Sequence, residues 1–193
     1  MPPRTKPRVL ASRMLARSWR VGFFEDTLQY EDGRVVPYAR LAVPDFALAV
    51  AIREKDGKIP LVKQYRPAAK HDFWELPAGF VERGETPLRC IKREFSEEVG
   101  SKLVKPRFIA CLYPSPARTI QRAYVFSGKI GKATPPQLDS TESLIPVFFS
   151  KHQAFQRLSE RISSPHLLAF LLCVGGENSH SHGFVSGWPK RCW

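Results

Sequence analysis

The segment from Gly79 to Gly100 constrains the fold of this chain more than any other part of the sequence. It joins a glycine-containing turn to a helix with one apolar face, and it concentrates charged residues between positions 85 and 98. These residues include four glutamates and an arginine: Glu85, Arg93, Glu94, Glu97 and Glu98. Glutamates this close together repel one another, so the cluster would cost stability unless cations neutralise it.

Local signals predict that the helix begins at Pro87 and ends before Gly100. Thr86 is a suitable N-cap, proline is tolerated at the first helical position, and glycine often ends a helix. Apolar residues recur at steps of three and four and form one stripe: Leu88, Ile91, Phe95 and Val99. Because Glu94 and Glu98 are four residues apart, both project from one face of this helix.

Two interpretations of the glutamates are open on helix physics alone. Oxygen ligands without cysteine or histidine partners favour a hard cation, Mg²⁺ or Mn²⁺, over zinc. Alternatively, the glutamates form a solvated helix face that pairs weakly with Arg89, Lys92 and Arg93. The spacing of the whole segment separates these interpretations.

That spacing resembles the Nudix box, the signature of the Nudix hydrolases. The box has the pattern G-x5-E-x7-R-E-U-x-E-E-x-G, where U is an apolar residue. Every specified position is filled, by Gly79, Glu85, Arg93, Glu94, Phe95, Glu97, Glu98 and Gly100. One departure is Ser101, where the family has an apolar residue; that position packs and does not bind metal.

Beyond the box, the sequence is similar to the ADP-ribose and ADP-sugar pyrophosphatase branch, and this resemblance extends over roughly residues 18 to 173. The matching segments are Val62–Pro67, Trp74–Gly79, a hairpin over Thr27–Arg40 that turns at Glu31–Gly33, strands at Phe46–Ile52 and near Leu144–Phe149, and a helix from Lys151. The resemblance implies an α/β/α sandwich with a mixed sheet and a small N-terminal antiparallel sheet. It also implies a homodimer that pairs through the N-terminal region.

The resemblance further implies an enzyme that cleaves the diphosphate of a nucleoside diphosphate sugar, giving a nucleoside monophosphate and a sugar phosphate. The implied cofactor is Mg²⁺, with Mn²⁺ as a substitute. The implied metal ligands are the backbone carbonyl of Ala78 and the carboxylates of Glu94, Glu97 and Glu98. Glu97 and Glu98 are also implied as catalytic residues, while Glu85 supports the cluster and Arg93 orients a glutamate.

Two further residues are expected near the reacting diphosphate. The branch often supplies a catalytic acid from a loop before the last strand, where Glu142 is preferred to Asp139; the alternative is an ordinary solvated acid. Arg66 is expected to contact a substrate phosphate, because its planar guanidinium matches phosphate oxygens. The alternative for Arg66 is a structural ion pair with Glu75.

Trp19 and Gln121 are the remaining candidates for substrate binding. Trp19 is expected to stack on the base, across a dimer, whereas Phe23 and Phe24 suit core packing better. Sugar-nucleotide members often carry Pro-Gly and then a glutamate in the loop after the box. Here Ala117 replaces the glycine and Gln121 stands near the place of the acid, so Gln121 is expected to face the substrate.

The rest of the sequence bounds the organisation of the chain. With 193 residues, of which 43% are apolar, one globular domain with a sizeable core is expected. No apolar run approaches the ~20 residues of a membrane span, so no membrane partner is expected. We expect a basic arm over residues 1–17, a Nudix domain over 18–174 with its N-terminal sheet at 18–45, and a mobile tail over 175–193.

The cysteines are scattered without close pairs, at Cys90, Cys111, Cys173 and Cys192. Cys90 and Cys173 lie in apolar helical stretches, where free buried thiols are common. This pattern favours a reducing compartment, so the cytoplasm is expected, and it argues against a zinc site.

The formal net charge of +12 suits a polyanionic substrate or nucleic acid. The first 24 residues contain no acid and six basic side chains, Arg4, Lys6, Arg8, Arg13, Arg17 and Arg20. This basic N-terminus has three readings: a free arm, a contact to RNA, or an organelle transit peptide, against which its prolines argue.

Two alternatives to the nucleotide-sugar hydrolase stay open. The basic N-terminus and the altered loop at Ala117 and Gln121 suit a Nudix-fold module that binds RNA or nucleotides with weak or no hydrolysis. The intact glutamates argue against this module, because binding alone does not require a repulsive cluster. A hydrolase of capped RNA or dinucleotides shares the box and differs only in its pocket.

Overall fold

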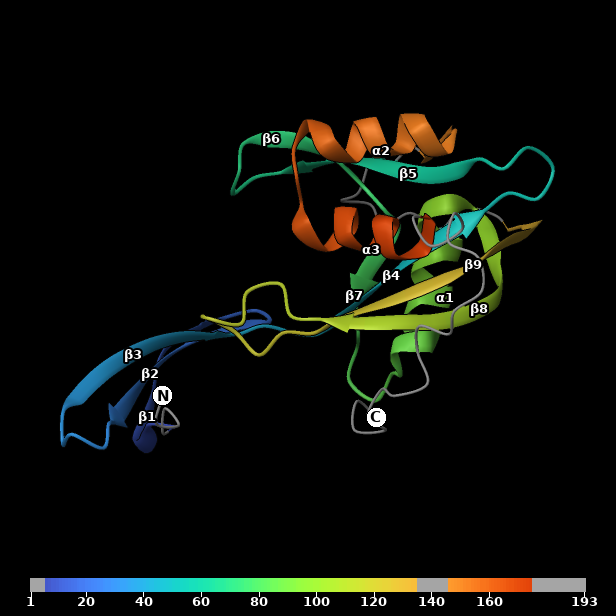
Figure 1. Cartoon of the computed structure of the whole chain (residues 1–193). Helices are drawn as coiled ribbons and strands as arrows, with labels where there is room; N and C mark the ends of the chain where they lie inside the picture. The colour runs from blue at the N-terminus through green and yellow to red at the C-terminus, as the bar shows by residue number, and fades with distance from the viewer. Residues whose placement is uncertain (1–5, 135–145, 175–193) are drawn as a thin grey trace, which may run out of the picture. The chain divides into compact units, whose positions relative to one another are not determined.

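The computed structural model describes residues 6–134 and 146–174 (Figure 1). Contacts between residues divide this part of the chain into two compact units. The first unit comprises residues 6–45 and 113–122, and the second comprises residues 46–112, 123–134 and 146–174.

The first unit contains a three-stranded antiparallel sheet in the order β1-β2-β3. Its strands are β1 (Arg8–Ser18), β2 (Val21–Gln29) and β3 (Val35–Ala42). The predicted hairpin between β2 and β3 is present: Gly33 has a positive φ of 81°, and the N–H of Tyr30 donates to the carbonyl of Arg34 at 2.9 Å. The 113–122 segment joins this unit through a bridge between Leu41 and Thr119.

The structure corrects the expectation of a separate basic arm over residues 1–17. Arg8–Ser18 form β1, which pairs with β2 from Arg8 opposite Gln29 to Ser18 opposite Val21. Every residue of β1 is exposed, so the strand has none of the apolar alternation that identifies a half-buried strand in a sequence. Residues 1–5 lie outside the described part of the chain.

The second unit is built on two sheets. The four-stranded sheet has the order β7-β4-β9-β8 and consists of β4 (Phe46–Ile52), β7 (Ala78–Phe80), β8 (Ser101–Leu112) and β9 (Ala123–Ala133). It is mixed, because β4 and β9 are parallel and the other pairs are antiparallel. The antiparallel second sheet has the order β10-β5-β6 and consists of β5 (Ile59–Arg66), β6 (His71–Glu75) and β10 (Pro146–Phe149).

Two apolar clusters on opposite faces of β4 hold the layers of this unit together. Leu48 and Val50 pack with residues of β5, α2 (Lys151–Glu160) and α3 (Ser164–Val174). The alternate residues of β4, Ala47, Ala49 and Ala51, pack against α1 (Pro87–Val99). Small alanine side chains let α1 approach the sheet closely. The resulting α/β/α sandwich with a mixed sheet confirms the predicted fold class (Figure 1).

Helix α1 begins and ends where the sequence predicts. The Thr86 hydroxyl accepts a hydrogen bond from the N–H of Arg89, and Pro87 is the first helical residue. Gly100 follows the helix in the left-handed conformation with φ 65°, and its N–H donates to the carbonyl of Ser96. The sequence signals therefore fix the direction in which the glutamates of α1 project.

The described cysteines Cys90, Cys111 and Cys173 are free thiols. Burial raises the pKa of Cys90 and of Cys173 to about 12 in each case, so both stay protonated at neutral pH. None of the helices in residues 6–134 and 146–174 has both the length and the apolar character that crossing a membrane requires.

Candidate active site

The glutamates of α1 lie against a backbone bend at the start of β7. This bend is held by pairing of β7 with β4, with Ala78 opposite Leu48 and Gly79 opposite Ala47. A Cβ atom added to Gly79 would lie 1.9 Å from Cδ of Glu94. Glycine is thus required here because the Glu94 carboxylate rests directly on the backbone.

Glu98 reaches the same bend one helical turn later. This residue is only 6% exposed, and its Oε2 accepts a hydrogen bond from the N–H of Ala78 at 3.0 Å. The structure therefore brings together Glu94, Glu98 and Ala78, three of the positions that the resemblance implies as metal ligands. Their binding of a metal stays a prediction.

Arg93 binds three of the four glutamates. Its Nη1 donates to Oε1 of Glu94 at 2.7 Å and to Oε2 of Glu97 at 3.1 Å. Its Nε and Nη2 donate to the two carboxylate oxygens of Glu85 at 3.1 and 3.0 Å. The hydrogen bond from Arg93 is the main cause that lowers the pKa of Glu85, and the bond to Glu85 is the main cause that raises the pKa of Arg93. Both groups therefore stay charged at neutral pH.

The four glutamates and Arg93, which we call the glutamate cluster, fit a hard divalent cation. The donors are all oxygen atoms, and the one guanidinium of the cluster pairs with three of its four carboxylates, so negative charge is in excess. Within residues 6–134 and 146–174, no three carboxylate, imidazole or thiol groups form a ready set of metal ligands. Arg93 instead holds Glu94 and Glu97, so we expect either carboxylate to turn from Arg93 when it takes a metal.

Arg66 forms the ion pair that was its alternative interpretation. Its Nε donates to Oε1 of Glu75 at 2.8 Å, and its Nη2 donates to Oε2 of the same carboxylate. The Glu75 side chain is 4% exposed, whereas that of Arg66 is 46% exposed. This bidentate geometry orients the guanidinium at the surface. Contact between Arg66 and a phosphate stays a prediction.

A buried histidine, His166, lies beside the Arg66–Glu75 ion pair, and its role was not predicted from the sequence. His166, on α3, accepts a hydrogen bond from the N–H of Leu76 at its Nδ1, at 3.1 Å. Its Nε2 lies 3.5 Å from Oε2 of Glu75. Since Nδ1 accepts a hydrogen bond, the proton of the neutral ring belongs on Nε2, which faces the carboxylate.

Burial is the main cause that lowers the pKa of His166, and the charge of Arg66 acts in the same direction while that of Glu75 opposes it. The ring is therefore neutral at pH 7. The only sequence signal was a histidine inside the apolar run of 164–174. Its partner Leu76 is 90 residues away, which no local pattern reveals.

The candidates Trp19 and Gln121 belong to the first unit. Trp19 lies between β1 and β2, is 78% exposed and has a positive φ of 47°; the guanidinium of Arg20 lies 4.8 Å from its ring centroid. The amide Nε2 of Gln121 donates to the carbonyl of Pro44 at 2.6 Å, which attaches the 113–122 segment to the end of the sheet. Neither role in substrate binding is tested by these contacts.

The expected core packing of Phe23 and Phe24 is wrong for Phe23, which is exposed, and only partly met by Phe24. Phe23 is 39% exposed, and Phe24 is partly buried with the guanidinium of Arg40 lying 4.4 Å from its ring centroid. Glu142 and Asp139, the candidates for the catalytic acid, lie outside the described residues, as does the predicted tail from residue 175.

Comparison with known proteins agrees with the resemblance. The sequence model of the NUDIX domain matches residues 44–171, which is more than half of the chain. The chain therefore belongs to the Nudix family.

Among curated relatives, the chain is 38% identical over 80 residues to an "ADP-ribose pyrophosphatase" of Bacillus subtilis, covering 42% of this chain and 43% of that protein. It is 31% identical over 117 residues to a "Methanol dehydrogenase activator" of Bacillus methanolicus, covering 60% of this chain and 63% of that protein. The matched region thus spans less than two thirds of the length of either relative. A solved structure titled "Crystal structure of ADP compounds hydrolase" has a TM-score of 0.76 at 19% identity, covering 90% of this chain and 95% of that one, which supports the fold.

Proposed function

We propose that this protein is a Mg²⁺-dependent pyrophosphohydrolase that cleaves the diphosphate of a nucleoside diphosphate sugar, with ADP-ribose as the nearest type of substrate. The products are a nucleoside monophosphate and a sugar phosphate. The observation that carries the proposal is the placement of Glu94 and Glu98 against the bend at Ala78 and Gly79. The printed name of the relative from Bacillus subtilis supports the substrate class.

Bound Mg²⁺, or Mn²⁺ in its place, would offset charge on the diphosphate and orient the attacking water. Glu94 and Glu98 would hold it together with the backbone carbonyl of Ala78. Among the glutamates paired with Arg93, Glu97 has the most exposed side chain, at 32% against 14% for Glu85 and 16% for Glu94. Glu97 is therefore best placed to accept a proton from water that reaches the cluster from solvent.

The remaining groups position the glutamates or bind the substrate. Arg93 bonds to both Glu85 and Glu97 and offsets their mutual repulsion, which orders the cluster before substrate arrives. Arg66 is oriented by Glu75 and presents a partly exposed guanidinium to a phosphate. Trp19 and Gln121 are proposed to contact the base and sugar, and Glu142 is proposed as a second catalytic acid.

We also propose that the protein is a homodimer that pairs through the first unit. The sheet of this unit exposes large apolar side chains, including Val9, Leu10, Met14, Leu15 and Val35, each at least 41% exposed. An apolar surface of this kind is typical of an interface. Light scattering is expected to give the dimer mass for the wild-type protein and the monomer mass for Met14→Glu. A wild-type monomer, or a Met14→Glu dimer, would contradict the pairing.

A substrate panel tests the activity. The purified full chain is incubated with ADP-ribose, ADP-glucose, GDP-mannose or UDP-glucose and Mg²⁺, and release of nucleoside monophosphate is measured by chromatography. Turnover of at least one nucleotide sugar is expected, together with a loss of about 100-fold or more in Glu98→Gln and no change in the exposed control Glu31→Gln. If none of the four nucleotide sugars is cleaved while NADH or capped RNA is cleaved, the proposed substrate class is contradicted. Salt-sensitive RNA binding without any hydrolysis would favour the binding module instead.

A further inference from the structure

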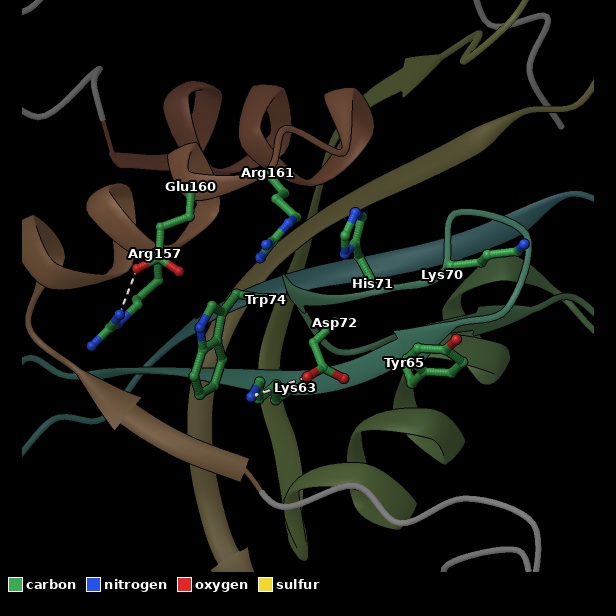
Figure 2. Close-up of a pocket in the computed structure, with 9 residues that line it drawn as sticks. All are labelled: Lys63, Tyr65, Lys70, His71, Asp72, Trp74, Arg157, Glu160 and Arg161. Carbon is green, nitrogen blue, oxygen red and sulfur yellow. Dashed lines mark hydrogen bonds and ion pairs between the residues drawn. The ribbon is translucent and has the colours of Figure 1, made fainter.

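A pocket of about 400 Å³ lies between the β5–β6 hairpin and the C-terminal end of α2, away from the residues of the box. Figure 2 shows Arg157 on α2 and Arg161, the residue that directly follows α2, near the hairpin residue Trp74. The side chains that matter for its chemistry are Lys63, Tyr65, Lys70, Trp74, Arg157 and Arg161. We call this the hairpin pocket.

The hairpin pocket carries an excess of positive charge. Four lysine and arginine side chains face two carboxylates, those of Asp72 and Glu160. Each carboxylate already has one partner: Asp72 lies 3.2 Å from Nζ of Lys63, and Glu160 accepts a hydrogen bond from Arg157 at 2.5 Å. In the described ranges 6–134 and 146–174, Lys70 and Arg161 have no ion pair. These two cations are therefore available to an anionic ligand.

Aromatic rings accompany the cations. Trp74 is fixed by an edge-to-face contact with Phe149, with ring centroids 5.1 Å apart, and the guanidinium of Arg157 lies 5.9 Å from the Trp74 ring centroid. Tyr65 is 57% exposed, so it offers a free surface on which a planar base can stack. A ligand that carries both a phosphate and a base fits this lining, because the phosphate can meet the cations and the base can stack on a ring.

The hairpin turn holds Lys70 in an unusual backbone conformation. Lys70 has a positive φ of 55°, which costs free energy for a residue with a side chain, and its N–H donates to the carbonyl of Arg66 at 2.9 Å. The turn therefore fixes where the Lys70 side chain leaves the backbone, although glycine would satisfy the same turn with less strain. A strained lysine in place of glycine at the rim is explained if its ammonium group has a ligand.

Most strand residues of the pocket lie on the opposite face of the hairpin from the Arg66–Glu75 ion pair; His71, which pairs with Arg66 at the hairpin end, is the exception. Lys63 is directly opposite Trp74 in the β5–β6 pairing, so these two share a face, and Tyr65 shares it by strand alternation. Arg66 and Glu75 follow Tyr65 and Trp74 by one position and point to the other face. The hairpin pocket is thus separate from the group that we assign to the substrate of the box.

We infer that the hairpin pocket is a second binding site, and that it takes a nucleoside phosphate, either as a free nucleotide or as a unit of a single-stranded RNA. The cations hold the phosphate and Tyr65 stacks on the base. Both carboxylates of the pocket are already paired with a cation, so we infer binding of this ligand. The inference does not depend on the activity proposed for the box.

The test measures binding to the full-length protein in EDTA, by calorimetry, with AMP, a uridine decamer, inorganic phosphate and polyglutamate as separate probes. The pocket variant is Lys70→Gln/Arg161→Gln. The matched control is Lys132→Gln/Arg107→Gln, which removes one lysine and one arginine that are exposed on β9 and β8. Tyr65→Ala removes the stacking surface alone.

AMP or the decamer is expected to bind at least about tenfold more weakly to the pocket variant than to the control. Preference for AMP identifies a free nucleotide as the ligand, and preference for the decamer identifies an RNA strand. Tyr65→Ala is expected to weaken binding of the base-bearing probe but not of phosphate. Glu98→Gln is expected to bind normally, which separates this site from the box.

Several outcomes would overturn the inference. They are an equal loss of probe affinity in the pocket variant and its control, binding of polyglutamate as tight as that of the nucleotide probes, and no binding of any probe. Turnover at the box should be unchanged in the pocket variant. A fall in turnover would show that the pocket is part of the active site and not a second one.

Discussion

Two groups of ionised side chains in the second unit differ in their balance of charge. In the glutamate cluster, one guanidinium bonds to three of four carboxylates, and the side chain of Arg93 is 31% exposed. In the second group, one buried carboxylate, Glu75, lies between Arg66 and a neutral His166. The first group has negative charge left over and the second has none.

This difference indicates which group needs a partner from solution. In a balanced ion pair with one buried partner, the two groups satisfy each other's hydrogen bonds and orient each other's side chains. An unbalanced cluster stays repulsive until a cation joins it. We therefore expect metal ions to affect the glutamate cluster and pH to affect the group around His166.

Gly79→Ala, which changes the glutamate cluster, should have the largest effect of the three substitutions. The new Cβ would lie 1.9 Å from Cδ of Glu94 and must displace that carboxylate. We expect turnover of a nucleotide sugar to fall about 100-fold, measured at saturating Mg²⁺. The control Gly57→Ala has a positive φ of 68° and open space around it, so it should cost stability and leave turnover intact. Normal turnover in Gly79→Ala would show that Glu94 does not need its place on the bend.

Arg93→Met should have the second-largest effect, because it leaves Glu85, Glu94 and Glu97 without their shared cation. We expect the free energy of unfolding in EDTA to fall by about 2 kcal/mol, at the low end for ion pairs of this kind because the arginine is partly exposed. Saturating Mg²⁺ should raise the stability of this variant more than that of the wild type, since the metal replaces the missing positive charge.

Urea denaturation with and without Mg²⁺ measures both effects, with Arg89→Met as the control because Arg89 lies on the same helix and is exposed. If Mg²⁺ stabilises Arg93→Met and Arg89→Met equally, the excess negative charge of the cluster is not what recruits the ion.

His166→Gln should have the smallest effect, visible mainly in the pH dependence of stability. The pKa of His166 is lowered in the folded protein, so the unfolded chain takes up a proton first as the pH falls. The contribution of this histidine to the free energy of unfolding is fully present above its unfolded pKa of about 6.5. It decreases as the pH drops toward the lower pKa of the folded state. Wild-type stability should therefore decline below about pH 6.5.

Urea denaturation between pH 5 and 8 should show a shallower decline for His166→Gln than for the wild type, together with a loss of about 1 kcal/mol at pH 7. His152→Gln, at an exposed position of α2, is the control. An unchanged slope in His166→Gln would mean that this ring does not stay neutral on folding.

Local signals were enough to predict the parts of the fold that depend on neighbouring residues. Thr86, Pro87 and Gly100 fixed the ends of α1, and the strand at Phe46–Ile52 was predicted with its observed bounds. The box gave the identity of the glutamates, but their contacts with Gly79 and Ala78 depend on the pairing of β7 with β4.

Features made by distant residues were not predictable from the sequence. His166 meets Leu76 and Glu75 only after α3 packs on the sheets, and the hairpin pocket exists only where α2 meets β5 and β6. β1 was missed for a different reason, since a fully exposed strand carries no alternating pattern.

The most direct test of the account is whether Glu94 and Glu98 together bind a divalent metal. Mn²⁺ titration followed by electron paramagnetic resonance measures the affinity without substrate. We expect the wild type to bind Mn²⁺ and Glu94→Gln/Glu98→Gln to bind it at least about tenfold more weakly, with the fold retained by circular dichroism. Equal affinity in a folded double variant would contradict the assignment of the metal to the bend at the start of β7.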